Sequence, residues 1–235
     1  MASYFEQSEK PWPSLIVVMP LVAVYELGTR GLLTENAAGP EQLIAFDLLR
    51  QAFFMLGATG SALPAMTLIA CLLGWHLARK DSWRVQPTVV GGMVLESLLL
   101  AVPLTLLAIA MARTTSVLSA TSGTNWVLMS IGAGVYEELI FRLVGFTVLH
   151  AILKDLLNLP SWITVGTMVA GSAAAFSAYH GLGSETLVLP SFVFRMVAGI
   201  LLGAIFLTRG FGVTALSHVA YNLILLGLRQ NAVIG

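Results

Sequence analysis

Long apolar stretches are the feature that most limits what this chain can fold into. A helix that crosses a bilayer needs about 20 mostly apolar residues. Six stretches approach that length, and a seventh is shorter but strongly apolar; they cover residues 15–28, 62–78, 89–112, 126–149, 163–179, 187–207 and 213–228. We therefore predict an all-α fold: a polytopic transmembrane helical bundle that forms a single integral membrane domain over residues 1–235.

The composition excludes several other classes of protein. Hydrophobic residues make up 57% of the chain and charged residues only 10%, against roughly 25% charged residues in a soluble domain. A soluble enzyme and a disordered chain are therefore excluded. The formal net charge of zero argues against a nucleic-acid partner, because such a partner requires a basic surface. The single cysteine, Cys71, excludes an intramolecular disulfide and a cysteine-cluster metal site.

The number of helices depends on residues 43–56, which contain Asp47 and Arg50 and are short for a span. This segment is either an amphipathic or re-entrant helix or an eighth helix packed inside the bundle, so the count is seven or eight. By the positive-inside rule, the cluster Arg79, Lys80 and Arg84 lies in the cytoplasm. If residues 43–56 do not cross, the N-terminus with Lys10 lies on the same side; if they cross, it lies opposite.

Alternation of the spans extends this orientation to the other loops. Lys154 and Arg209 are expected on the cytoplasmic side, and Arg113 and Arg229 on the outer side. His76 and His150 are expected near water at the ends of spans, with no assigned function.

Polar residues inside the apolar stretches need an explanation, because a charge at bilayer depth costs about 2.5–3.5 kcal/mol. The candidates are Glu26, Glu96, Glu137, Glu138, Arg142, His180, Arg195, His218 and Asn222. Glu26 and Arg30 are four residues apart and are expected to pair. Glu96 and Arg195 are single charges of opposite sign, and we predict that they meet across two helices.

Glu137, Glu138 and Arg142 lie deep inside one apolar stretch. Glu138 and Arg142 are four residues apart on one helix face and can pair, whereas Glu137 points to another face. A carboxylate without a partner in its own helix, held in a dry pocket, is suited to act as a general base. The alternative is an ion-pair cluster that only holds helices together.

Two further apolar segments each carry a polar group at helical spacing. Phe176 and His180 share a face near the end of one span, and His218 and Asn222 share a face in the last span. His218 and Asn222 can direct donors to one point, as in oxyanion stabilisation. Each group taken alone also fits ordinary interhelical hydrogen bonding. Taken together, the three groups predict a shared intramembrane polar cavity.

The three motifs, Glu137-Glu138-x-x-x-Arg142, Phe176-x-x-x-His180 and His218-x-x-x-Asn222, resemble the signature of the CAAX prenyl endopeptidase and bacteriocin-processing family of intramembrane proteases, also called the Abi family. The resemblance places the catalytic core in residues 126–228 and implies an eight-helix bundle with a water-filled cavity. It also implies hydrolysis of a peptide bond by a glutamate-activated water.

The resemblance implies a role for each matching residue. Glu137 would be the general base, and His180 would hold or polarise the water. His218 and Asn222 would stabilise the oxyanion, while Glu138 and Arg142 would orient Glu137. We favour a mechanism without a cofactor, because no His-Glu-x-x-His helix is present; a zinc ion bound by Glu137, His180 and His218 stays open as the alternative.

The expected partners are the lipid bilayer and a membrane-associated protein or peptide substrate, with or without a lipid group. The resemblance and the short loops favour the inner membrane of a prokaryotic cell. Two other functions stay open: a non-enzymatic bacteriocin-immunity or scaffold protein, and, less favoured, a small proton-coupled transporter. The absence of an inverted repeat in the sequence argues against the transporter.

Overall fold

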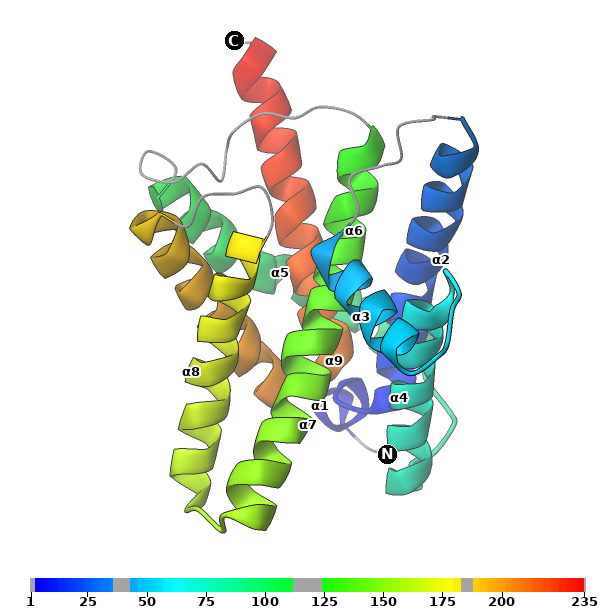
Figure 1. Ribbon diagram of the computed structural model, residues 1–235, viewed down its shortest axis with the longest axis vertical. Helices are drawn as coiled ribbons and strands as arrows, with labels where there is room; N and C mark the ends of the chain where they lie inside the picture. Colours follow the sequence, from blue (N-terminus) through cyan, green and yellow to red (C-terminus); the bar gives the residue numbers. More distant parts are fainter. Residues whose placement is uncertain (1–2, 36–42, 112–123, 183–187, 235) are drawn as a thin grey trace.

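The described residues form a bundle of helices without strands (Figure 1). The computed structural model describes residues 3–35, 43–111, 124–182 and 188–234. Arg113 therefore lies outside the described residues, as does the side chain of Arg229. The helical fold expected from the apolar stretches is confirmed.

Residues 3–35 and 43–111, the described part of the N-terminal half, form five helices. They are α1 (Tyr4–Ser8), α2 (Pro11–Glu35), α3 (Ile44–Met55), α4 (Leu63–Arg79) and α5 (Pro87–Met111). In the C-terminal half, α6 (Thr124–Glu138) continues through the π-helical turn η2 (Leu139–Val144), α7 (Gly145–His150) and a second π-helical turn, η3 (Ala151–Leu156). Helix α8 (Ser161–Tyr179), the short turn η4 (His180–Leu182) and α9 (Leu189–Ile234) complete the chain.

Three of the described helices are long and apolar enough to cross a bilayer: Pro11–Gly31, Pro87–Met111 and Leu189–Leu228. Together with the shorter apolar helix Leu63–Arg79, they identify an integral membrane protein. The outer face of α5 carries exposed leucines such as Leu95 and Leu99, and Leu104 on its inner face is buried. Because lipid tails are as apolar as leucine, such a face is stable against the membrane.

Helix α9 is two predicted spans joined by a sharp bend at Gly210. Its two halves diverge from this bend in Figure 1, drawn in orange and red. Gly210 has φ 73° and ψ −177°, a conformation that is essentially restricted to glycine. A Cβ atom at this position would also lie 2.9 Å from the carbonyl oxygen of Glu9. The break expected between residues 207 and 213 is therefore a single glycine, against which the N-terminal segment packs.

Helix α3 is too short to cross the hydrocarbon core of a bilayer. Its 12 residues span about 18 Å at 1.5 Å per residue, less than the ~30 Å hydrocarbon core. The N-terminus and the 79–84 loop also lie together: Lys10 pairs with Asp81 at 3.3 Å, and the Trp12 indole donates to the Trp83 carbonyl at 2.8 Å. This neighbourhood is the one expected if residues 43–56 do not span.

The predicted pair between Glu96 and Arg195 is wrong. Arg209 binds Glu96 instead, with Nε 2.6 Å from Oε1 and Nη2 2.8 Å from Oε2. Arg195 lies 14 residues earlier on the straight first half of α9, about 21 Å away along the helix axis. Sequence spacing gave no means of choosing between two arginines on the same helix.

His76 is also placed differently from the expectation. It is 1% exposed and packs against the ring of Trp83, with 4.2 Å between the ring centroids. His150 is exposed and faces Asp155, as expected for a residue near water. The expected pair of Glu26 and Arg30 is confirmed at 3.1 Å, and the Tyr136 hydroxyl donates to the same carboxylate at 2.9 Å.

We expect Gly210→Ala to destabilise the protein by about 1–3 kcal/mol, because alanine is strained at this backbone conformation. The apparent melting temperature in detergent should fall accordingly. Gly227→Ala is the matched control on the same helix, since a Cβ atom at Gly227 meets nothing within 4 Å. Equal melting temperatures for the two variants would contradict the account of the bend.

The ion pair of Glu96 and Arg209 predicts a specific rescue. Glu96→Arg should lower the melting temperature, because it sets two guanidinium groups against each other. Adding Arg209→Glu should restore part of the loss, whereas adding Arg195→Glu should restore none. Rescue by the second combination would reinstate the pair predicted from the sequence.

Candidate active site

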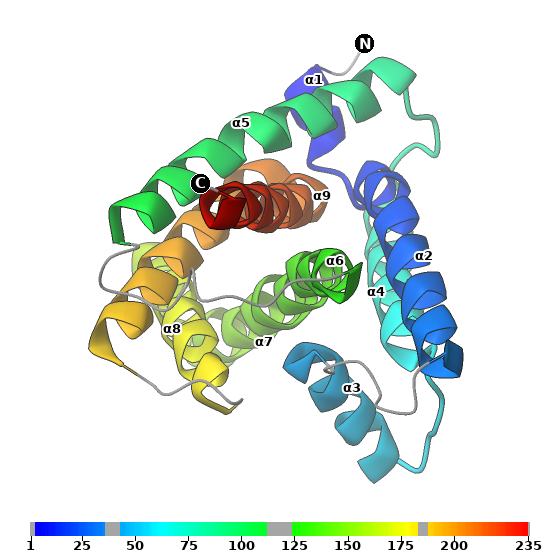
Figure 2. The ribbon, with the colours of Figure 1, turned by 90° about the horizontal axis from the view of Figure 1, so that it is seen from above.

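The six predicted site residues lie on three neighbouring parts of the fold. Glu137 and Glu138 end α6, and Arg142 lies in the following turn η2. His180 directly follows α8, and His218 and Asn222 lie in the second half of α9. Helices α6, α8 and η2 all pack against α9, and Figure 2 shows this arrangement along the bundle.

Glu138 is the centre of a buried charged network. Its Oε1 atom lies 3.1 Å from Nη1 of Arg142 and 2.7 Å from Nδ1 of His218. Arg142 also donates from Nη2 to the Gly199 carbonyl at 3.0 Å. Glu138 and Arg142 are 0% exposed and His218 is 4% exposed. The pair of Glu138 and Arg142 thus connects α6, η2 and both halves of α9.

Phe176 packs at the centre of the same network. The guanidinium carbon of Arg142 lies 4.7 Å from the centroid of the Phe176 ring, a cation–π geometry. The ring also lies edge-on to His180 at 4.9 Å and to His218 at 6.1 Å between centroids. The phenylalanine of the second motif therefore separates the two histidines and covers the arginine.

The wide turn η2 begins directly after the glutamate pair. π-Helical turns lengthen the hydrogen-bonding interval and are frequent at functional sites. The hydroxyl of Ser172 on α8 donates to the Phe141 carbonyl within this turn at 2.8 Å. The turn retains the expected contact between Glu138 and Arg142, and it fastens α8 beside them.

Glu137 has a different environment from its neighbour. Its Oε1 atom accepts a hydrogen bond from the Tyr179 hydroxyl at 3.3 Å, and its Oε2 atom lies 3.9 Å from Nε2 of His218. Glu137 is 5% exposed. Both neighbours come from other helices, as expected for a glutamate that faces away from Arg142. Sequence spacing did not identify Tyr179, because a tyrosine beside His180 belongs to no spaced motif.

Hydrogen bonds set the orientation of both histidines. Nδ1 of His180 lies 2.9 Å from the Phe176 carbonyl, and Nδ1 of His218 lies 2.7 Å from the Glu138 carboxylate. Since a carbonyl or carboxylate accepts, each Nδ1 carries the hydrogen that is donated. In the neutral tautomer, the Nε2 atoms of both rings therefore present lone pairs.

Asn222 departs from the expected arrangement. Its Nδ2 atom donates to the Ser130 carbonyl at 3.3 Å, while His218 binds Glu138, eight residues further along α6. The two side chains thus contact different turns of α6, so the structure does not bring their donors to one point. Residues at four-residue spacing share a helix face, but each side chain bonds to the acceptor that packing places beside it.

Among the residues that the structure describes, His, Cys, Asp and Glu side chains form no group of three arranged to hold a metal ion. Nδ1 of His218 bonds to Glu138, which leaves Nε2 as the ring nitrogen that could bind one. The zinc alternative with Glu137, His180 and His218 as ligands stays a prediction.

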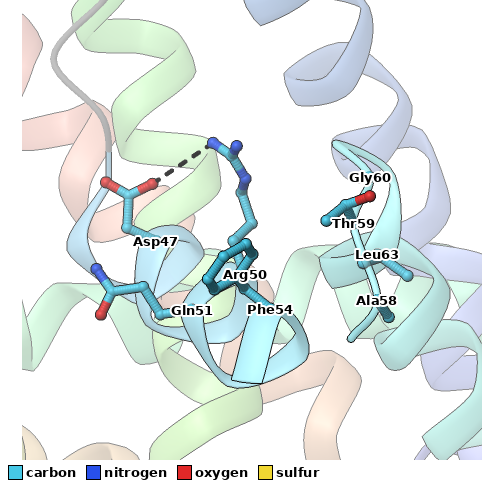
Figure 3. Close-up of a pocket in the computed structure, with 8 residues that line it drawn as sticks. All are labelled: Asp47, Arg50, Gln51, Phe54, Ala58, Thr59, Gly60 and Leu63. Atoms are coloured by element: carbon cyan, nitrogen blue, oxygen red, sulfur yellow. Dashed lines mark ion pairs between the residues drawn. The ribbon is translucent and has the colours of Figure 1, made fainter. Parts of the chain in front are cut away.

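A cavity of about 330 Å³ lies between α3 and residues 58–63 (Figure 3). Asp47, Arg50 and Gln51 of α3 line one side, and Thr59 and Leu63 line the other. None of the six predicted site residues lines this cavity. The charged side chains Glu137, Glu138, Arg142 and His218 are buried in the bundle instead. Helix α3 packs against α6, where Phe46 lies edge-on to Tyr136 at 5.4 Å.

The network predicts unequal stability effects for the two glutamates. Glu138→Gln should destabilise the protein by about 3–5 kcal/mol, because Arg142 keeps a buried charge without its carboxylate. Glu137→Gln should change stability by less than about 1 kcal/mol, because Glu137 has no such partner. Melting temperatures of the purified variants measure the difference, and equal losses would contradict the division of roles.

Residues 119–224 match the family model described as Type II CAAX prenyl endopeptidase Rce1-like. No curated protein and no solved structure gives a significant match to the chain. The match includes all three motifs, from Glu137 to Asn222, and supports an intramembrane protease of the CAAX type that acts on a membrane-associated protein. The family resemblance stated from the motifs is thereby confirmed: the segment that carries this site belongs to the CAAX prenyl endopeptidase family.

Proposed function

We propose that this protein is an intramembrane endopeptidase in which Glu137 activates a water molecule to hydrolyse a peptide bond of a membrane-associated protein or peptide. The observation that carries the proposal is the contrast between two adjacent glutamates. Glu138 is bound by Arg142 and His218, whereas Glu137 lies 3.9 Å from the Nε2 atom of His218 and is bound by neither a lysine nor an arginine in the described network.

The spacing between Glu137 and His218 suits a bridging water. A separation of 3.9 Å exceeds a direct hydrogen bond, and polar groups at such distances commonly share a water. A water donating to Oε2 of Glu137 would be activated by a general base. Its second hydrogen can be donated to the Nε2 lone pair of His218.

The reaction then follows from proton balance. Glu137 takes one proton from the water while the water oxygen bonds to the carbonyl carbon of the substrate. The resulting oxyanion requires hydrogen-bond donors. The Asn222 amide carries two N–H groups, of which the Ser130 carbonyl takes one. Glu137 finally returns its proton to the leaving amine as the C–N bond breaks.

The remaining site residues are proposed to position this chemistry. His180 presents the lone pair of Nε2, because its Nδ1 atom donates to the Phe176 carbonyl, and it would hold and polarise the water by accepting a hydrogen bond from it. Glu138 and Arg142 hold η2 and α9 in place and fix the ring of His218. This assignment uses no metal ion, and the inner membrane of a prokaryotic cell remains the proposed location.

A membrane-reconstituted cleavage assay tests the general base. The probe is a quenched fluorogenic peptide that ends in a prenylated cysteine and three further residues, added to the protein in liposomes. We expect cleavage by the wild type, and a fall of about 10²–10⁴-fold for Glu137→Gln, the usual contribution of a general base. Glu9→Gln is the control, because it makes the same chemical change at a glutamate outside the site: Glu9, on the N-terminal segment, bonds to Arg209.

Cleavage by a folded Glu137→Gln variant at the wild-type rate would remove the proposed role of Glu137. Absence of cleavage by the folded wild type would instead favour the non-enzymatic immunity or scaffold protein, for which the buried network is purely structural.

Metal dependence is tested separately. The purified wild type, dialysed against a strong chelator and analysed for bound metal, should retain its rate on the same peptide. Loss of activity that returns with stoichiometric Zn²⁺ would replace the metal-free mechanism.

A further inference from the structure

Tyr179 is the buried polar group closest to the reaction that neither the motifs nor the family match assigns. It is the last residue of α8 and is 5% exposed. Its hydroxyl donates to Oε1 of Glu137 at 3.3 Å. Its ring lies edge-on to Phe141 at 5.2 Å and to His180 at 5.0 Å between centroids. The phenol is therefore held on both sides and cannot turn freely away from Glu137.

The hydrogen bond from Tyr179 makes the two carboxylate oxygens of Glu137 different from each other. Oε1 is occupied by the Tyr179 donor, and Oε2 faces Nε2 of His218. A carboxylate that turned freely would present either oxygen to water, and only one position is productive. A neutral donor also favours the ionised form of the carboxylate without pairing it to a full charge.

We propose that Tyr179 is a positioning residue for the peptidase reaction: it fixes Oε1 of Glu137 so that Oε2 is the oxygen that takes the proton from water. The inference rests on the proposed function and adds a residue to it.

The charged and titratable groups around Glu137 define what a pH profile reports. Glu138 precedes η2, Arg142 lies within it, His218 faces from α9, and Asp47 of α3 is near enough to Tyr179 to interact with its ring electrostatically. His180 follows Tyr179 directly. The Tyr179 hydroxyl donates to Glu137 and to none of these other groups in the described network, so a changed acidic limb reports on Glu137.

The test compares Tyr179→Phe with Tyr136→Phe on the prenylated peptide in liposomes. Tyr136 is the matched control: it is buried, it adjoins Glu137 in sequence, and its hydroxyl donates to Glu26 instead. Tyr179→Phe should lower kcat by about 10-fold, as expected for roughly 1.4 kcal/mol, leave KM unchanged, and move the acidic limb of the pH–rate profile to higher pH. Tyr136→Phe should leave the acidic limb unmoved.

A variant that preserves the shape of the ring guards against misfolding. Replacing Tyr179 with 3,5-difluorotyrosine makes the hydroxyl a stronger donor, and it should move the acidic limb to lower pH, opposite to the phenylalanine variant. Superimposable profiles for the wild type and both Tyr179 variants overturn the inference. If Glu137→Gln is inactive in that same assay, only the role of Tyr179 fails; if Glu137→Gln is active, the proposed function fails with it.

Discussion

The bond between Glu138 and Arg142 is the interaction on which the site depends. Both side chains are fully buried in an apolar bundle, where an unpaired charge is far more costly than in water. The pair is stabilised further by His218, by the Gly199 carbonyl and by the Phe176 ring. These partners come from α8 and α9, and Glu138 itself ends α6, so the charge pair also fixes the relative positions of α6, α8 and α9. The network fixes the position of Glu137, the neighbour of Glu138 in α6, without binding the Glu137 carboxylate to Arg142.

The helices follow from the sequence because membrane burial and helix formation depend on the same property, a long apolar run. The same physics explains the pairs of Glu138 with Arg142 and of Glu26 with Arg30, since four-residue spacing is a local rule. The bend at Gly210 was expected only as a break between spans. Its tight geometry depends on contact with Glu9, about 200 positions away in the chain, which no local pattern encodes.

The contacts that sequence reasoning missed all join distant segments. Arg209, not Arg195, binds Glu96, because the N-terminal helix brings Ser8 and Glu9 to the bend and completes the arginine's partners there. Tyr179 contacts Glu137 because α8 ends at the level of η2. Asn222 of α9 bonds to Ser130, because the Ser130 carbonyl is the α6 acceptor that lies beside it. In each case the residue type was visible, and its partner was set by packing.

The central claim is that Glu137, placed by its neighbours' ion pair, adds water to a peptide bond inside the bundle. Cleavage of a membrane-embedded peptide in H₂¹⁸O, followed by mass spectrometry of both fragments, tests this claim most directly. The account predicts one ¹⁸O atom in the new carboxyl end during a single turnover of the wild type, and no labelled fragment from a folded protein in which residue 137 is glutamine. Unlabelled fragments from the wild type, or labelled fragments from that variant, would contradict it.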